Sequence, residues 1–226
     1  MKRILSFLCA ALVLTVLPTR IFAQSANVYY KHCDGEMDIA LTFDDGPHPI
    51  KTPKILDILK EYGVKATFFT IGQNVEYYPE AAKRILSEGH EIGNHTQTHP
   101  HLKKTERELL VTELESCERS IKNVIGYTTS VFRPPEGVVD DDVKAIASDM
   151  GYSVILWSVD TRDWAGTPSE KIVSTVLESI SPGDIILMHD YTSKNCHTIE
   201  ALRILIPKLC EMGYNFVTVS ELISKK

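Results

Sequence analysis

The segment Ile39-Ala40-Leu41-Thr42-Phe43-Asp44-Asp45-Gly46-Pro47 decides the fold, because a short apolar run ends at two acidic residues and a turn signal. An apolar run of this length, bounded by Gly and Pro, predicts a strand. The next segment, from Thr52 to Gly63, has the apolar spacing of an amphipathic helix, with Thr52 predicted as N-cap and Pro53 at the first helical position. Strand and helix together form one βα unit.

The same alternation of strand and helix continues to the end of the chain. Further strands are predicted at residues 66–71, 91–93, 130–132, 153–157, 184–187 and 216–219. Helical patterns lie between them at residues 80–88, 105–124, 140–150, 169–180 and 199–212. This order predicts an α/β fold with a parallel sheet, which right-handed crossovers close into a barrel or arrange as a doubly wound layer.

Composition places the chain among globular proteins, since 43% of its 226 residues are hydrophobic and 24% are charged. Residues 1–23 differ from this average: Lys2 and Arg3 precede an apolar run over residues 4–17, without acidic residues. This pattern predicts a secretory signal peptide, because the apolar run is shorter than the roughly 20 residues that span a bilayer. We expect residues 24–226 to form one secreted, monomeric domain. The protein would contact a membrane only if the signal at residues 1–23 stayed uncleaved.

Charge and cysteine content narrow the classes of partner. The chain has 24 basic and 30 acidic residues, and without residues 1–23, which contain three basic residues, the balance is 21 to 30, or −9. Such a charge excludes a protein that binds the nucleic-acid backbone. Once Cys9 leaves with the signal, Cys33, Cys117, Cys196 and Cys210 remain, and their pairing stays open. Cys117 and Cys210 fall in helical patterns and are expected to be small buried hydrophobes.

Polar, chemically capable residues follow five of the predicted strands. These are Asp44-Asp45-Gly46-Pro47-His48, Asn94-His95-Thr96-Gln97-Thr98-His99, Arg133-Pro134-Pro135-Glu136, Asp160-Thr161-Arg162-Asp163-Trp164 and His189-Asp190. Because the carboxyl ends of parallel strands share one face of a barrel, these loops converge there. The sequence therefore predicts an active site at the C-terminal face.

His95 and His99 have the spacing of two imidazoles that turn toward one point. With a carboxylate from the first strand they form a set of three ligands, which leaves a coordination position for water. The neighbouring Asp44 and Asp45 would be costly to bury unless a metal takes one and Arg133 the other. The alternatives are two ordinary histidines and an Asp-Asp-Gly-Pro turn with one solvated carboxylate.

Taken together, these motifs resemble the polysaccharide deacetylases of carbohydrate esterase family 4, the nodulation-protein-B homology domain. The resemblance covers residues 38–219 and rests on five motifs in order: Thr42-Phe43-Asp44-Asp45-Gly46-Pro47, His95-Thr96-Gln97-Thr98-His99, Arg133-Pro134-Pro135, Asp160-Thr161-Arg162-Asp163-Trp164 and Leu187-Met188-His189-Asp190. It implies a distorted (β/α) barrel of seven or eight parallel strands. It also implies metal-dependent hydrolysis of acetyl groups on a polysaccharide.

The resemblance also implies a role for each site residue. Asp44 would be the catalytic base, held by Arg133, and His189 the general acid, tuned by Asp163. The metal ligands would be Asp45, His95 and His99, usually for Zn²⁺, with Co²⁺, Ni²⁺ and Mn²⁺ as alternatives. The substrate-facing residues would be Pro135, Glu136, Trp164 and Leu187. Many family members have an aromatic residue where this chain has Glu136, which leaves the choice of polymer open.

The predicted secretion and the implied chemistry together predict an extracytoplasmic, cell-wall-associated enzyme that removes N-acetyl groups from N-acetylglucosamine or N-acetylmuramic acid in peptidoglycan. Chitooligosaccharide and acetylxylan are alternative substrates. A non-catalytic glycan-binding module would be expected to have lost Asp44, a ligand or His189, and none is lost. A glycosidase with two carboxylates would need neither a metal nor the pair of histidines, so chelator sensitivity separates these classes.

Several aromatic residues outside the motifs have two interpretations. Tyr29-Tyr30 and Tyr77-Tyr78 are candidate platforms for stacking sugars, with ordinary half-buried tyrosines as the alternative. His48 and His101 are expected on the rim of the cleft, and Trp157 in the barrel core.

Overall fold

The computed structural model describes residues 26–32, 35–103, 106–191 and 196–225. The predicted signal peptide at residues 1–23 and Cys33 lie outside the described residues. No helix among the described residues combines the length and apolar character needed to span a membrane.

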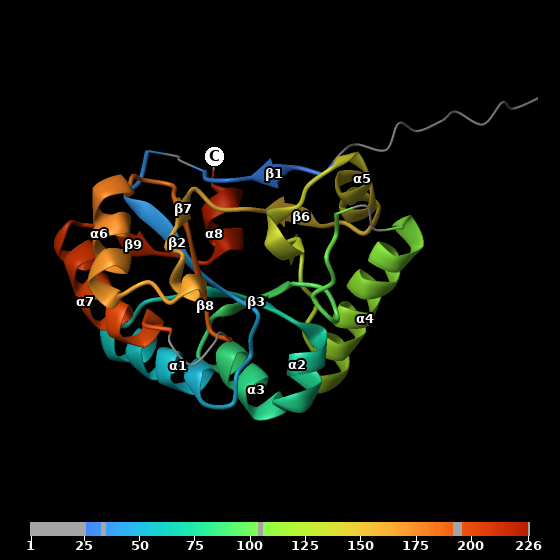
Figure 1. Ribbon diagram of the computed structural model, residues 1–226, viewed down its shortest axis with the longest axis horizontal. Helices are drawn as coiled ribbons and strands as arrows, with labels where there is room; N and C mark the ends of the chain where they lie inside the picture. Colours follow the sequence, from blue (N-terminus) through green and yellow to red (C-terminus); the bar gives the residue numbers. More distant parts are fainter. Residues whose placement is uncertain (1–25, 33–34, 104–105, 192–195, 226) are drawn as a thin grey trace, which may run out of the picture.

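The elements alternate largely as predicted, as Figure 1 shows along the chain. The strands are β1 Val28–Tyr29, β2 Asp38–Asp44, β3 Thr67–Thr70, β4 Glu91–Asn94, β5 Val131–Phe132, β6 Ser153–Ile155, β7 Val159–Asp160, β8 Ile185–His189 and β9 Asn215–Phe216. The α-helices are α1 Lys51–Tyr62, α2 Gly72–Tyr77, α3 Pro79–Ser87, α4 Arg107–Ile125, α5 Asp141–Asp149, α6 Ser169–Ser179, α7 Thr198–Glu211 and α8 Val219–Ser224. Two short 3₁₀ helices, η1 Pro135–Gly137 and η2 Asp163–Ala165, lie in the loops after β5 and β7.

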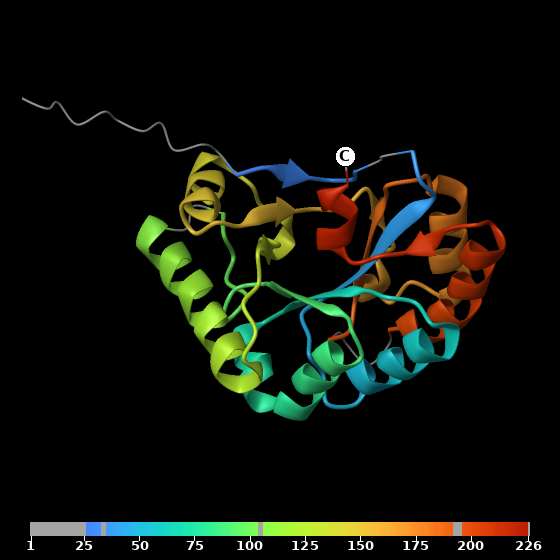
Figure 2. The ribbon, with the colours of Figure 1, turned by 180° about the vertical axis from the view of Figure 1, so that it is seen from behind.

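The sheet curls into a distorted barrel of parallel strands, in the order β1-β6-β5-β4-β3-β2-β8-β7, with β9 paired to β2. Residues 153–160 connect the two ends of the curled sheet. β6 pairs with β5, whereas β7, which three residues separate from β6, pairs with β8. The helices pack around the outside, while β1 and α8 occupy the remaining side (Figure 1, and from behind in Figure 2). The predicted barrel is confirmed.

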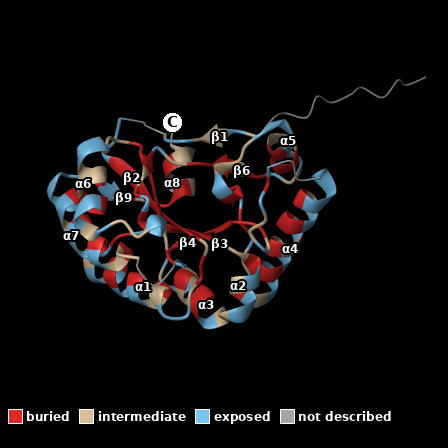
Figure 3. Ribbon diagram, viewed as in Figure 1, coloured by how far each residue is buried: buried red, intermediate tan, exposed pale blue. Residues whose placement is uncertain are grey.

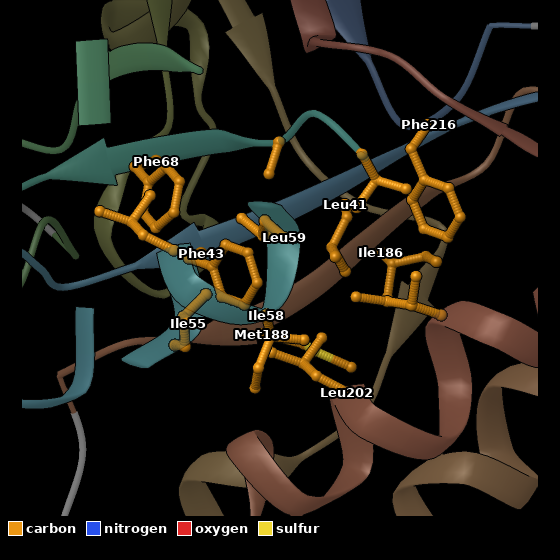
Figure 4. Packing of buried hydrophobic residues seen from close by; sticks show 14 of the residues in the cluster. Leu41, Phe43, Ile55, Ile58, Leu59, Phe68, Ile186, Met188, Leu202 and Phe216 are labelled. Atoms are coloured by element: carbon orange, nitrogen blue, oxygen red, sulfur yellow. The ribbon is translucent and has the colours of Figure 1, made fainter. Parts of the chain in front are cut away.

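Strand β2 is buried along its whole length and sorts its side chains between two environments. Leu41 and Phe43 pack outward against Ile55 and Leu59 of α1 in the main hydrophobic cluster, as Figure 4 shows. Ala40 packs inward, with apolar residues from β3, β5, β6 and β8. Because successive side chains of a strand point to opposite faces, Thr42 and Asp44 also lie on the inward side.

The burial of the residues follows the arrangement of a sheet surrounded by helices. Figure 3 shows the central strands of the sheet buried and β1 at its edge half-buried, whereas the helices are buried on the side that faces the sheet and exposed on the other. Amphipathic helices of this kind follow from the spacing seen in the sequence. The core therefore forms a rigid ring that holds the ends of its strands in place.

Gly93 in β4 provides space for the ring of Phe69 inside the barrel. A Cβ at this position would lie 2.4 Å from Phe69 Cδ1 and 3.2 Å from Val131 Cγ2. We expect Gly93→Ala to lower the free energy of unfolding by about 1–3 kcal/mol, because a packed ring inside the barrel must shift. Urea unfolding of the variant and the wild type measures the difference, and equal stability would show that the interior is less tightly packed than described.

The structure differs from the sequence prediction near the C-terminus. A strand was expected over residues 216–219, but β9 ends at Phe216 and α8 begins at Val219. Thr218 is the N-cap of α8: its side chain accepts from the Glu221 backbone N–H, and the Glu221 carboxylate accepts from the Thr218 backbone N–H. This capping box favours a helix over the strand that the β-branched residues suggest.

Among the described residues, Cys117, Cys196 and Cys210 form no disulfide bond. Cys117 in α4 is buried, as expected, and Cys196 is half-buried. Cys210 in α7 is exposed, so its predicted burial was wrong. It lies just beyond the buried stripe of α7, whose last buried residue is Leu209.

Candidate metal centre and active-site cleft

The register of β2 and β8 places two chemically complementary side chains next to each other. Asp44 and His189 are direct partners in this parallel pairing, and each is the last residue of its strand. Both therefore lie at the carboxyl end of the barrel. This is the face at which the sequence predicts the site.

Arg133, at the end of β5, is fully buried and fixes Asp44. Its Nη1 donates to Asp44 Oδ1 at 2.7 Å and to Thr42 Oγ1 at 2.8 Å. Its remaining donors reach the carbonyls of Ile155 at 3.2 Å and Leu156 at 3.0 Å. The guanidinium lies 4.1 Å from the centre of the Phe69 ring. A buried guanidinium with four hydrogen bonds holds the Asp44 carboxylate in one orientation.

Asp45, His95 and His99 form a cluster in which the ligand atoms lie within 4.8 Å of one another. Asp45 Oδ1 is 3.5 Å from His95 Nε2 and 3.4 Å from His99 Nε2. The same oxygen is buried and has no hydrogen-bond partner. Two imidazole nitrogens and a carboxylate oxygen that lacks a partner are a donor set that suits a divalent transition metal.

The surroundings orient His95 for ligation. Its Nδ1 lies 2.7 Å from the carbonyl oxygen of Arg133, which places the proton on Nδ1 and leaves the Nε2 lone pair facing Asp45. Burial opposes a charge on His95, but Asp44 and Asp45 raise its pKa. Burial would likewise raise the pKa of Asp45, but His95, His189 and His99 lower it. The two carboxylates thus favour a positive charge on His95, whereas burial and His95 lower the pKa of His99.

The loops that carry these residues adopt backbone conformations that side chains rarely tolerate. Left-handed φ angles at non-glycine positions occur, among the described residues, at Asp45, Thr96, His99, Glu136 and Arg162, with values of 74°, 69°, 56°, 58° and 53°. All five lie in loops at the carboxyl ends of strands. Such conformations cost on the order of 1–3 kcal/mol each and persist only where the surroundings enforce them.

Hydrogen bonds from neighbouring helices hold the loops after β2 and β4. Asn74 of α2 donates to the carbonyl of Asp45 at 2.7 Å. Glu113 of α4 accepts from the backbone N–H and the hydroxyl of Thr98, at 2.8 and 2.9 Å. The outer helices thus set the loop geometry that brings His95 and His99 together.

His189 is held by Asp163 from the loop after β7. Its Nδ1 lies 2.8 Å from Asp163 Oδ1, and its backbone N–H donates to Oδ2 at 2.9 Å. Thr198 donates to the same Oδ2 at 2.5 Å. Burial would lower the pKa of His189, but Asp163, supported by Asp44 and Asp45, raises it to about 9. His189 is therefore an imidazolium at neutral pH and can donate a proton.

These groups line one cleft with a volume of about 520 Å³. Its walls are formed by Asp44, Asp45, His95, His99, Glu136, Trp157, Asp160, Trp164, Leu187 and His189. Trp164 is 51% exposed at the rim, whereas Leu187 is almost fully buried. Pro135 is buried and is not among the lining residues. Glu136 lies at the wall, where its carboxylate is 2.7 Å from Nδ1 of His101.

The sequence did not assign several residues that shape this site. Trp157, expected in the core, lines the cleft with Asp160. Glu113 is an acid on the buried stripe of an amphipathic helix, a signal that the helical spacing could have revealed.

Thr52, predicted as an N-cap, has another role. The helix begins at Lys51, and Thr52 is buried and donates to Asp190 Oδ2 at 2.5 Å. It accepts the backbone N–H of His48 at 2.7 Å, so it ties the loop after β2 to the end of β8.

The fold and the site together define a (β/α)-barrel protein with a candidate metal centre, a paired carboxylate and an imidazolium at its C-terminal face. Residues 31–155 match the polysaccharide deacetylase family. Over 195 residues the chain is 42% identical to a peptidoglycan-N-acetylglucosamine deacetylase of Bacillus cereus, with 85% of this chain and 91% of the relative covered. The chain therefore belongs to the polysaccharide deacetylase family.

Two further similarities agree with this membership. The chain is 38% identical over 215 residues to a chitooligosaccharide deacetylase of Bradyrhizobium sp., covering 89% of this chain and 97% of the relative. It also resembles the crystal structure of the Bc1960 peptidoglycan N-acetylglucosamine deacetylase in complex with a naphthalenyl N-hydroxybenzamide. That comparison has a TM-score of 0.85 at 36% identity and covers 89% of this chain and 94% of the other.

Proposed function

We propose that this protein is a metal-dependent hydrolase that removes N-acetyl groups from N-acetylglucosamine or N-acetylmuramic acid in peptidoglycan. The observation that carries the proposal is the arrangement of Asp44 and His189 on adjacent strands, beside the cluster of Asp45, His95 and His99. A base, an acid and a three-ligand centre in one cleft are the groups that amide hydrolysis requires.

The proposed ligands of the metal ion are Asp45, His95 and His99, and Zn²⁺ is the proposed ion. The unpartnered Asp45 Oδ1 and the orientation of His95 support this assignment. When bound, the ion supplies Lewis-acid activation of water and of the acetyl carbonyl.

The side chains of this chain account for the movement of protons. Asp44, fixed by Arg133, takes a proton from the water whose oxygen attacks the carbonyl carbon. His189 gives its proton to the departing nitrogen as the carbon–nitrogen bond breaks, so that the products are acetate and a free amine. Asp163 keeps His189 protonated and oriented. Leu187 and Trp164 form the wall proposed to receive the acetyl methyl group.

The choice of polymer rests on two lines of support. The Bacillus cereus relative is named for peptidoglycan, and the signal-like pattern at residues 1–23 suits an extracytoplasmic enzyme. Chitooligosaccharide is the second candidate, because the Bradyrhizobium relative is named for it and both polymers carry the same N-acetyl group. Acetylxylan is a further candidate substrate, because Glu136 lines the cleft where many family members have an aromatic residue.

Metal binding should depend on His99. We expect the wild type to hold one divalent ion per chain and His99→Ala to lose most of it, because three ligands fall to two. Metal analysis after dialysis measures this, with His32→Ala as a control imidazole outside the cluster. Full metal content in His99→Ala would place the ion elsewhere.

Acetate release tests the proposed activity. The expected result is release from peptidoglycan that chelation abolishes and Zn²⁺ restores, with chitooligosaccharide and acetylxylan measured in parallel. Release that is insensitive to chelator would contradict metal dependence, and the absence of release from all three substrates would contradict the proposed function.

A further inference from the structure

A group of aromatic rings lies outside the cleft lining, on segments that follow the active-site strands, and the steps proposed above make no use of it. The group, which we call the tyrosine platform, consists of Tyr77, Tyr78, Tyr191 and His48. The ring centres of His48 and Tyr191 are 4.8 Å apart, those of Tyr78 and Tyr191 are 6.5 Å apart, and those of Tyr77 and Tyr78 are 6.2 Å apart. Three separate segments of the chain thus contribute to one surface.

The platform is continuous with the loops that build the active site. Tyr191 comes two residues after His189, and His48 comes three residues after Asp45. Tyr77 ends α2 and Tyr78 joins it to α3, which packs beside α1 on the outside of the barrel (Figure 1). His48 and Tyr191 therefore lie at the same end of the barrel as the cleft, where a polymer held in the cleft would continue.

The rings are accessible and held in place. Tyr77 is 61% exposed and Tyr191 is 37% exposed. The Nδ1 atom of His48 accepts the backbone N–H groups of Ile50 at 3.0 Å and Lys51 at 3.1 Å, which fixes the imidazole ring. Gln73 donates to the Tyr77 hydroxyl at 2.9 Å. Rigid aromatic side chains lose little conformational entropy when a ligand stacks on them.

A groove of about 330 Å³ lies next to the rings. It is lined by Pro49, Pro53, Tyr77, Tyr78, Pro79, Glu80, Ala81 and Arg84. Its two charged side chains have partners, since Glu80 is 2.8 Å from Lys83 and Arg84 is 2.6 Å from Asp57. Burial, with a contribution from Lys51, lowers the pKa of His48, which favours its uncharged form. The surface offers apolar ring faces and hydroxyl groups without unpaired charge.

We propose that the tyrosine platform is a second carbohydrate-binding subsite, which stacks against uncharged sugar units of a glycan chain whose acetylated unit lies in the cleft. The inference rests on the proposed function. A pyranose ring has an apolar face and a polar edge, which match the faces and hydroxyl groups of tyrosine. A charged peptide would find no free counter-charge among the groove residues named above, and this favours sugar over a protein partner.

The test compares short and long substrates in Tyr78→Ala, Tyr191→Ala and the conservative variant Tyr191→Phe. We expect the two alanine variants to raise KM for long glycan strands about tenfold, with little change in kcat and none in KM for a disaccharide. Tyr191→Phe should retain most of the wild-type KM because the ring remains. Tyr30→Ala is the matched comparison, since Tyr30 is 54% exposed and adjoins β1; an unchanged KM in this variant would also exclude the Tyr29-Tyr30 pair as a platform.

A binding measurement makes the result independent of turnover. Chelator-treated wild type should bind insoluble peptidoglycan strands about tenfold more tightly than chelator-treated Tyr78→Ala or Tyr191→Ala. Weaker binding in these variants, when the untreated wild type releases no acetate, would sustain the platform while the proposed function fails. Unchanged binding and unchanged KM on long strands would overturn the platform, as would equal losses on short and long substrates.

Discussion

Asp44→Asn should lower the rate of acetate release by about 10²–10⁴-fold, because an amide cannot accept the proton of the attacking water. Its metal content should remain close to that of the wild type, since the proposed ligands are Asp45, His95 and His99. Asp57→Asn is the matched control, because Asp57 also pairs with an arginine but lies on the outside of the barrel.

The Asp44 variant also needs a check of folding. Removing the carboxylate leaves the buried Arg133 without its ionic partner, which costs on the order of 3–5 kcal/mol. Circular dichroism and the thermal midpoint show whether the variant is folded. A folded variant with near-normal turnover would refute the role of base. A folded variant without metal would show that Asp44 is itself a ligand.

The second large effect concerns the pH profile of Asp163→Asn. His189 must be protonated to act as the acid, so activity is present below its pKa, which Asp163 raises against the effect of burial, and declines as pH rises through it. Without the Asp163 carboxylate, burial dominates and the pKa of His189 falls. The basic limb of kcat/KM should therefore move to lower pH by more than about one unit.

The controls separate this effect from a general loss of charge in the cleft. Asp160→Asn changes another carboxylate of the cleft wall, one that accepts the backbone N–H of Arg162 at 2.9 Å, and should leave the basic limb near its original pH. His189→Ala should remove most activity at every pH. The variants are compared with the same bound metal, because its charge lowers the pKa of His189 in each of them. A basic limb that stays in place in Asp163→Asn would exclude His189 as the titrating acid.

Much of the barrel could be predicted because apolar runs and turn residues mark its strands directly. β2 and its acidic end are visible in the segment from Ile39 to Pro47, and the other motifs follow strand ends in the same way. The β6–β7 segment was harder to predict, because one apolar run supplies two strands that pair with different neighbours. Local sequence does not specify such closure, which depends on contacts distant in the chain.

Part of the candidate site could likewise be predicted from the sequence, and part could not. The spacing of His95 and His99 suggested a shared ligand cluster, and the structure brings both together with Asp45. The support by Glu113 and Thr52 depends on which helix positions face the loops, and this is settled only when the helices pack. The predicted N-cap role of Thr52 was wrong because an N-cap pattern is local, whereas its bond to Asp190 joins residues that are 138 positions apart in the sequence and follow two neighbouring strands.

Mass spectrometry of muropeptides treated with residues 24–226 of the protein is the most direct test of the proposed function. The expected result is the loss of one acetyl group from the sugar, which is absent in chelator, absent in Asp44→Asn and restored by Zn²⁺. Unchanged muropeptide masses, from a preparation that removes acetyl groups from chitooligosaccharides, would contradict peptidoglycan as the substrate. Unchanged masses for both would contradict deacetylation itself.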